Sequence, residues 1–220
     1  ASVLRKLIRR LKLAGRVSVL HEDFLSASIP DDRPRIFIGN PPYVRHHALP
    51  RSRKSWLGMA GRALGNTFSE LAGLHVYFLL RCLMEAKSGD RLVMVLPSEW
   101  LETRYGADLK RSLLDRASSI ALYVFPPGAQ IFEGTMTTSV VLDLGFGGAG
   151  VDVSAGLIDP SKKSIVRGPL TMQLPQTAPE RANWLHLAWA ATGCEHAFDR
   201  DLPGTVELGD LFRIHRGQVT

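Results

Sequence analysis

Short strand-like runs alternate with helical stretches along this chain, and this alternation limits the possible folds more than any other feature. Residues 91–96 (RLVMVL) are continuously apolar after the first position, as in a strand buried on both faces. Residues 70–87 carry apolar side chains at helical spacing, and a second such stretch starts at Pro97. Further strand-like runs cover residues 17–20, 35–38, 120–125 and 138–144. The pattern predicts an α/β fold with a mostly parallel, doubly wound sheet.

Composition narrows the class of protein. Among 220 residues, 45% are hydrophobic and 22% are charged, which excludes a mainly disordered, collagen-like or coiled-coil chain. No apolar run approaches the roughly 20 residues that span a bilayer, so no membrane partner is expected. The two cysteines, Cys82 and Cys194, are too few for a disulfide framework or a zinc cluster. A cytoplasmic protein fits this cysteine usage.

Positive charge gathers in two stretches, within a formal net charge of +6. Residues 1–21 hold six cations and no acid, and their apolar residues at helical spacing predict an amphipathic helix that covers a sheet with its basic face in solvent. Residues 44–69 hold five cations and no acid, and we interpret them as a long functional loop. The excess of arginine suits a polyanionic partner.

The tetrapeptide Asn40-Pro41-Pro42-Tyr43 directly follows the strand-like residues 35–38 and Gly39. Ligands of open α/β sheets bind at the carboxyl ends of strands, which is where these residues fall. The prolines stiffen the loop and remove backbone donors, so carbonyl groups and the Asn40 amide oxygen can act as acceptors. Tyr43 adds a flat aromatic face. Such a site suits a planar base with an exocyclic amine that attacks a methyl sulfonium, with catalysis by orientation and electrostatics.

Three segments of the chain, IGNPPYVR, GDRLVMVLPSEWL and IFEGTMTTSVVL, resemble N6-adenine DNA methyltransferases of restriction–modification systems. The resemblance covers roughly residues 17–145. It implies a Rossmann-like methyltransferase fold, S-adenosylmethionine as cofactor, double-stranded DNA as partner and a bacterial or archaeal cytoplasm. The implied reaction is methyl transfer to the N6 amine of an adenine flipped out of the duplex.

The resemblance also assigns roles at matching positions. Asn40, Pro41, Pro42 and Tyr43 are the expected catalytic residues, in which Asn40 and the Pro41 carbonyl bind the target amine. Tyr43 and Phe132 are expected to stack on the target base. Asp23, Phe24 and Asn40 are the expected cofactor-binding residues. The cations expected near the DNA backbone are Arg45, Arg51, Arg53 and Lys54. No metal site is expected, and His46 and His47 are interpreted as polar loop residues.

Two departures from the family pattern are present. Arg35 stands where the family usually has an acidic residue. The Gly-rich cofactor loop and the acidic residue that holds the ribose are absent before Ala1, so we expect a fragment, inactive alone, with an incomplete sheet and exposed strand edges. Residues 1–145 are then a partial catalytic domain. Residues 146–220 are a linker and the start of a target-recognition region, and the remainder of the same polypeptide is an expected partner.

Two alternative functions remain open from the sequence. Enzymes that methylate a glutamine amide of release factors, or a base of ribosomal RNA, share the tetrapeptide. The second alternative is a non-catalytic DNA-binding or interaction module, because the cofactor loop is absent.

Overall fold

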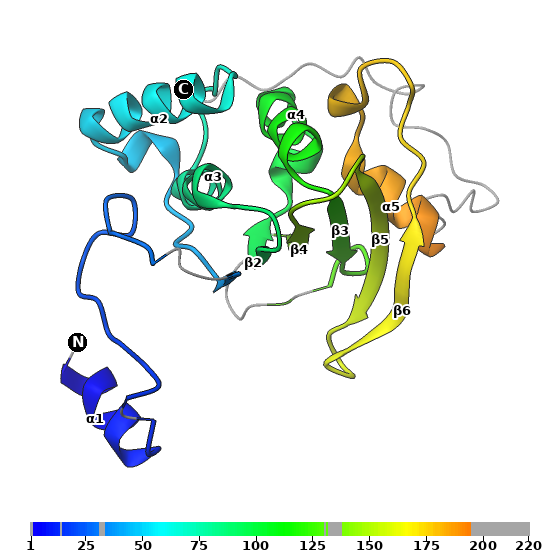
Figure 1. Ribbon diagram of the computed structural model, residues 1–220. Helices are drawn as coiled ribbons and strands as arrows, with labels where there is room; N and C mark the ends of the chain where they lie inside the picture. The colour runs from blue at the N-terminus through cyan, green and yellow to red at the C-terminus, as the bar shows by residue number, and fades with distance from the viewer. Residues whose placement is uncertain (1, 14, 31–33, 130, 132–137, 195–220) are drawn as a thin grey trace, which may run out of the picture.

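Six strands form one mixed sheet in the computed structural model, which describes residues 2–13, 15–30, 34–129, 131 and 138–194 (Figure 1). The strand order is β1-β2-β4-β3-β5-β6. The strands are β1 (Ile36–Gly39), β2 (Arg91–Pro97), β3 (Ser119–Val124), β4 (Ser139–Gly145), β5 (Asp152–Asp159) and β6 (Ser164–Thr171). The predicted α/β class is confirmed.

The sheet is mixed, whereas the sequence pattern predicted a mostly parallel one. β1 pairs with β2, and β3 with β5, in parallel. β4 lies antiparallel between β2 and β3, and β6 is antiparallel to β5. No helix lies in the described part of the link between β3 and β4, and a parallel return would need a crossover, usually a helix. The antiparallel placement of β4 agrees with the described part of this link.

The described residues contain five α-helices. α3 and α4 lie next to each other against the sheet, α2 lies outside α3, and α5 lies beside β5 (Figure 1). Their bounds are α1 (Ser2–Arg10), α2 (Arg51–Leu64), α3 (Leu74–Glu85), α4 (Ala107–Arg116) and α5 (Trp184–Thr192). Short 3₁₀ turns are η1 (His46–Ala48), η2 (Glu99–Leu101), η3 (Arg104–Gly106) and η4 (Pro179–Arg181). None of the helices in these ranges is long and apolar enough to cross a membrane.

The core lies between α3, α4 and one face of the sheet. Leu92, Met94 and Leu96 of β2 are buried, while Val93 and Val95 on the opposite face are only half-buried. The expectation that this strand is buried on both faces is therefore met fully on one face only. The alternation follows from the pleat of a strand, which turns successive side chains to opposite faces.

The predicted strand at residues 17–20 does not form. This segment is irregular, and Val17 and Leu20 are 44% and 60% exposed. β1 is consequently the edge strand of the described sheet, and Ile36 and Ile38 are 67% and 80% exposed on it. Exposed apolar side chains at an unpaired edge agree with the expected incomplete sheet.

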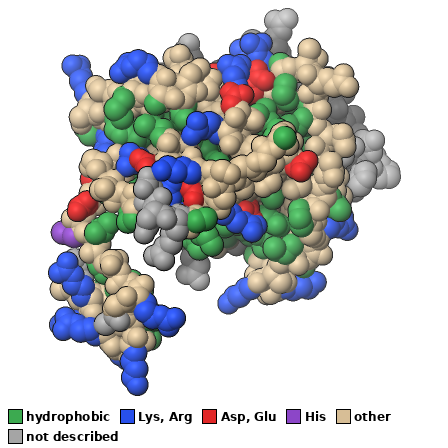
Figure 2. Space-filling model, in the orientation of Figure 1, with side chains coloured by type: hydrophobic (Ala, Val, Ile, Leu, Met, Phe, Trp, Pro, Cys, Tyr) green, Lys and Arg blue, Asp and Glu red, His purple; other side chains and the backbone are tan. Residues whose placement is uncertain are grey.

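α1 forms where the sequence predicted an amphipathic helix, but it does not cover the sheet. Figure 1 shows it apart from the strands, and Figure 2 shows Lys and Arg side chains around it. Only Ile8 of its apolar face is buried, while Leu4, Leu7 and Leu11 are about half-exposed. The predicted packing of this helix on a sheet is therefore wrong for the described residues.

The basic stretch expected to be a long loop is largely the helix α2. Leu57, Ala60 and Gly61 form its buried face, and Gly65 ends it with a left-handed φ of 69°. The cations of residues 51–62 therefore project from a regular helix. Three small or apolar residues at helical spacing decide the structure of this segment, and its run of cations does not prevent the helix.

The sheet continues across residues 145–150, which hold four glycines and include the predicted boundary between residues 1–145 and 146–220. β5 begins at Asp152, after that stretch, and pairs in parallel with β3. The predicted boundary after residue 145 therefore falls within one sheet. Residues 195–220, the later part of the expected linker and start of a target-recognition region, lie outside the described residues.

Candidate functional site

The loop Asn40–Tyr43 follows β1 at the carboxyl edge of the sheet. The parallel register aligns Gly39 with Met94, so the loop lies beside the residues that end β2. The Tyr43 hydroxyl donates a hydrogen bond to the carbonyl of Val95 over 3.3 Å. This contact ties the tyrosine ring to the neighbouring strand while the residue remains 36% exposed. The sequence prediction placed the tetrapeptide at this edge, and the structure has it there.

Asn40 and the two prolines differ in burial. Pro41 is buried, whereas Asn40 and Pro42 are exposed. Within the described part of the chain, no hydrogen bond engages the Asn40 side chain. Its amide oxygen is therefore available to accept a hydrogen bond from a ligand, as a site for an exocyclic amine requires.

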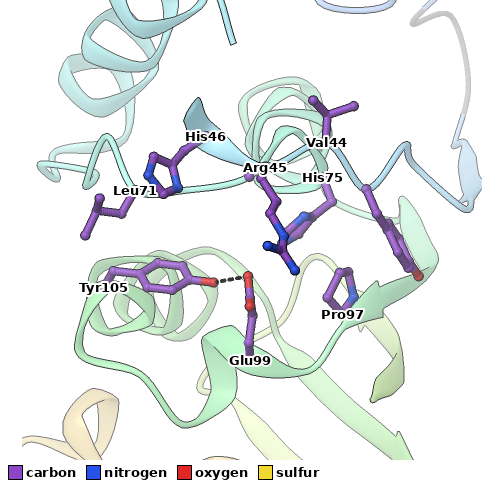
Figure 3. Close-up of a pocket in the computed structure, with 10 residues that line it drawn as sticks. Val44, Arg45, His46, Leu71, His75, Pro97, Glu99 and Tyr105 are labelled. Carbon is purple, nitrogen blue, oxygen red and sulfur yellow. Dashed lines mark hydrogen bonds between the residues drawn. The ribbon is translucent and has the colours of Figure 1, made fainter. Parts of the chain in front are cut away.

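A cavity of about 370 Å³ opens beside Tyr43 (Figure 3). Polar side chains from several parts of the chain line it, among them Arg45 from the loop after β1, His75 from α3 and Glu99 from η2. A volume of this order is typical of small-molecule sites, and a few converging polar groups are what fixes a ligand in them. The full lining is Tyr43, Val44, Arg45, His46, Leu71, Gly73, His75, Pro97, Glu99 and Tyr105.

Glu99 is held in place at this cavity. The Tyr105 hydroxyl donates a hydrogen bond to Glu99 Oε1 over 2.8 Å, drawn as a dashed line in Figure 3. Burial raises the pKa of Tyr105, and the bond to the carboxylate raises it further. The hydroxyl consequently stays protonated at neutral pH and keeps donating, which fixes the orientation of the carboxylate.

His75 forms part of the cavity wall next to Tyr43. The two rings are arranged edge to face with centroids 6.0 Å apart. His75 is only 3% exposed, and burial lowers its pKa to about 4, although the charge of Glu99 acts in the opposite direction. The imidazole is therefore neutral at physiological pH. Its Nε2 atom is buried and has no hydrogen-bond partner in the described ranges.

Sequence reasoning did not single out His75, Glu99 or Tyr105. His75 had one detectable signal, because it is a polar residue within an otherwise apolar helical run. Glu99 and Tyr105 lie six residues apart around two short 3₁₀ turns, and the expected continuous helix would have placed them differently. Their convergence on the cavity depends on that irregular backbone.

Asp23 and Phe24, predicted to bind cofactor, lie away from the lining of this cavity. Phe24 stacks on Phe78 of α3 with centroids 5.1 Å apart and planes 15° apart. Asp23 Oδ2 accepts a hydrogen bond from Arg53 over 2.7 Å, and Oδ1 accepts one from the Leu25 backbone over 3.2 Å. Chiefly because of Arg53, the pKa of Asp23 lies below its ordinary value.

The cations predicted to lie near DNA fall into two groups. Arg53 and Lys54 are paired with acids, since Lys54 contacts Glu70 over 2.9 Å and Arg53 contacts Asp23. Arg51 is exposed on α2, and Arg45 lines the cavity. Phe132, predicted to stack on the target base, lies outside the described residues. No cluster of potential metal ligands occurs in the part of the chain that the structure describes.

Arg35, the departure from the family pattern, has a clear structural partner. Its Nη2 lies 2.7 Å from Oδ2 of Asp90, and its backbone N–H donates to Oδ1 of the same carboxylate over 2.7 Å. The arginine also donates to the Glu85 carbonyl. It therefore fastens the start of β1 to the end of α3 and the turn before β2, and it is not part of the candidate site.

Comparison with known proteins gives a consistent set of relatives. Residues 35–132 match the Eco57I restriction-modification methylase family. The chain is 33% identical over 224 aligned residues to the Type II methyltransferase M.XamI of Xanthomonas campestris pv. amaranthicola, an alignment that covers all of this chain and 41% of that relative. It is 31% identical over 124 residues to the Type II methyltransferase M.XhoI of Xanthomonas vasicola, covering 56% of this chain and 22% of the relative. The chain thus spans less than half the length of these curated relatives.

Solved structures share the fold at lower identity. A DrdV–DNA complex has a TM-score of 0.50 at 15% identity, over 70% of this chain and 18% of that one. A nuclease-deletion mutant of the Type ISP restriction-modification enzyme LlaGI with a DNA substrate mimic has a TM-score of 0.50 at 16% identity, over 68% of this chain and 15% of that one. Together with the relatives, these matches confirm the predicted resemblance to restriction–modification DNA methyltransferases and the predicted methyltransferase fold.

Proposed function

We propose, starting from this kinship with restriction–modification methyltransferases, that the chain carries the target-base site of an enzyme that methylates the N6 amine of adenine in DNA, with S-adenosylmethionine as donor. The observation that supports this most is the placement of Asn40–Tyr43 at the carboxyl edge of the sheet, next to a cavity that includes Tyr43. The activity belongs to the intact enzyme, and the role of this chain is to hold and orient the base.

The reaction requires a nucleophilic amine whose lone pair is normally delocalised into the ring. The Asn40 side-chain oxygen and the Pro41 carbonyl accept hydrogen bonds from the two amine hydrogens, which favours a pyramidal nitrogen with its lone pair directed at the donor methyl group. The ring of Tyr43, held by its bond to Val95, stacks on the base and fixes its plane. A bond forms between N6 and the methyl carbon as the bond between that carbon and sulfur breaks, and the amine then loses a proton to solvent. Catalysis by orientation of this kind needs no strong base.

The residues expected to hold the cofactor fit an adenosine group chemically. Phe24 offers an apolar aromatic ring, stacked on Phe78, and Asp23 offers a partly exposed carboxylate that can accept from an adenine amine. S-adenosylmethionine supplies the electrophilic methyl sulfonium when bound. The ion pair with Arg53 keeps the Asp23 carboxylate ionised and therefore able to accept a hydrogen bond.

DNA is the proposed partner because exposed cations accompany the candidate site. Arg45 lines the cavity, and Arg51 lies on the α2 surface close after it in the chain. Cations placed like this bind phosphates without reading sequence and give a salt-dependent affinity.

The test is methyl transfer by the intact gene product carrying Asn40→Ala. Labelled methyl groups from S-adenosylmethionine are counted on duplex DNA, and the methylated nucleoside is identified by mass spectrometry. We expect N6-methyladenine from the wild type and at least about a 100-fold lower rate for the variant, the scale of losing one positioned transition-state hydrogen bond. Binding of the duplex, followed by fluorescence anisotropy, is expected to stay within about threefold, because Asn40 acts on the reacting amine.

A matched control is Gln173→Ala, which removes an exposed amide side chain elsewhere in the chain. This variant should leave the rate of methyl transfer and the affinity for duplex DNA unchanged. Wild-type turnover by Asn40→Ala contradicts the role of Asn40. Methylated RNA or protein glutamine without methylated DNA contradicts the proposed substrate.

A further inference from the structure

One buried polar atom in the wall of the cavity has no partner in the described ranges. The Nε2 atom of His75 is enclosed, while the residue itself lines the cavity beside Tyr43. Buried nitrogen atoms in folded proteins almost always have a hydrogen-bond partner, because leaving one unsatisfied is unfavourable. An exception in a cavity wall indicates a partner supplied by a ligand.

The local backbone brings the His75 ring unusually close to the start of its own helix. A Cβ atom on Gly73 would lie 2.9 Å from His75 Cε1 and 3.1 Å from the Val44 carbonyl oxygen, both too short for a real side chain. The Leu74 backbone N–H donates to that same carbonyl over 2.9 Å. A glycine at position 73 therefore lets the imidazole fold back against the loop that carries Tyr43. Edge-to-face contact with Tyr43 limits the ring from the other side.

The chemistry of the ring defines which ligand atom it suits. Its low pKa, caused by burial and only partly offset by Glu99, makes the imidazole neutral at physiological pH. The charged groups that face the same cavity are Arg45 and Glu99. A neutral imidazole provides one N–H donor without a full charge, and an uncharged ring nitrogen of a base can accept from it. Adenine carries two such nitrogens on the side of its amine, N1 and N7.

We infer that His75 is a specificity-determining residue of this site: its Nε2 donates a hydrogen bond to N1 or N7 of the adenine that stacks on Tyr43. This inference rests on the proposed function and deepens it, because Asn40 and Pro41 recognise only the amine. The contact forms when the imidazole turns about its Cβ–Cγ bond toward the cavity, a torsion with a broad energy profile in histidine. A base that has the amine but lacks the ring nitrogen is then a poor substrate.

The experiment is a cycle that combines variants of the intact enzyme with modified DNA. The target adenine of an unmethylated substrate duplex is replaced by 7-deazaadenine or 1-deazaadenine, each of which keeps the amine and exchanges one ring nitrogen for a C–H group. For the wild type, kcat/KM is expected to fall about tenfold on one of the two analogues, the scale of one neutral hydrogen bond. His75→Phe keeps an aromatic ring of similar size. Its kcat/KM on adenine is expected to be about tenfold below that of the wild type. On the analogue that the wild type discriminates against, kcat/KM of this variant should fall by less than a further twofold.

Two further variants separate recognition from folding. His75→Gln retains a side-chain N–H donor and should restore most of the preference for adenine. Gly73→Ala keeps the imidazole but pushes it out of its position, so it should lose the preference as His75→Phe does. Circular dichroism and the melting temperature identify any variant that fails to fold.

The inference is overturned if His75→Phe, or Gly73→Ala where the former does not fold, still discriminates as strongly as the wild type. Equal wild-type rates on adenine and both analogues overturn it as well. Failure of the proposed function is a different result, since the wild type would then methylate neither adenine nor its analogues in DNA.

Discussion

Arg53 donates a hydrogen bond to Asp23 across 2.7 Å and thereby links α2 to the segment that follows residue 20. The sequence assigned these residues to different ligands, Arg53 to DNA phosphates and Asp23 to the cofactor. Their pairing places the two expected binding surfaces next to each other. It also means that Arg53 is less available to phosphates than an unpaired arginine on the same helix.

Arg51 and Arg53 should therefore differ in DNA binding. Replacing Arg51 by Ala is expected to reduce the salt slope of duplex binding by about 1, the effect of removing one phosphate contact. Replacing Arg53 by Ala should reduce the slope by clearly less, because its guanidinium is occupied by Asp23. The slopes are measured by fluorescence anisotropy over a series of salt concentrations with the intact protein. Lys54→Ala, whose amine pairs with Glu70, is the matched control and should behave like Arg53→Ala. Equal slopes for Arg51→Ala and Arg53→Ala would contradict this assignment.

Tyr43 should act through its ring more than through its hydroxyl. Tyr43→Phe keeps the ring and removes the hydroxyl, and with it the 3.3 Å hydrogen bond to Val95, so kcat/KM on duplex DNA is expected to fall by less than about threefold. Tyr43→Ala removes the stacking surface, and stacking of a base on an aromatic side chain contributes about 1–3 kcal/mol. The expected loss is about 10- to 100-fold, measured by the same methyl-transfer assay. A phenylalanine variant as impaired as the alanine variant would show that the hydroxyl carries the role.

The Arg35–Asp90 pair should make stability depend on acid pH. Burial acts to raise the pKa of Asp90, but hydrogen bonds from Arg35 and from the Lys87 backbone outweigh it, so the pKa lies below its ordinary value. A carboxylate with a lowered folded-state pKa stabilises the protein above its unfolded pKa, and this stabilisation is lost as pH falls through the folded pKa. Asp90→Asn should destabilise the protein by about 3 kcal/mol at neutral pH, since Asp90 is 3% exposed and Arg35 loses its partner.

Urea unfolding of the wild type and Asp90→Asn at several pH values tests this. The difference between the two free energies of unfolding should be largest near neutrality and shrink below about pH 4. A difference that stays constant on acidification would rule out this role of the carboxylate.

Lys110 should make stability depend on alkaline pH. It is 1% exposed, donates to the carbonyls of Leu101 and Ala182, and burial lowers its pKa to about 8, partly offset by Glu180. Because the unfolded chain holds this proton up to a higher pH than the folded chain does, the free energy of unfolding should rise with pH from about 8 to the ordinary lysine range. In Lys110→Met this rise should be absent. Urea unfolding across that range measures it, and parallel profiles for the two proteins would refute the prediction.

Much of the framework was predictable from local sequence. The runs at residues 91–96, 120–125 and 138–144 became β2, β3 and β4 within one or two residues, because continuous apolar β-formers between turn residues have few alternatives. The position of Asn40–Tyr43 after β1 was predictable for the same reason. Residues 17–20 show where this reasoning failed: a β-rich run makes a strand only if a neighbouring strand pairs with it, and among the described residues none does.

The amino-acid sequence by itself determined the α/β class, the strand that presents Asn40–Tyr43 and the stiffness of that loop, since these depend on side-chain periodicity and on proline. The tertiary structure alone decided that β4 lies between β2 and β3, that Asp23 pairs with Arg53, and that His75, Glu99 and Tyr105 meet Tyr43 at one cavity. These contacts join residues far apart in the chain through irregular turns and a close approach at Gly73. Local pattern carries no information on such contacts, because they arise only when separate elements pack together.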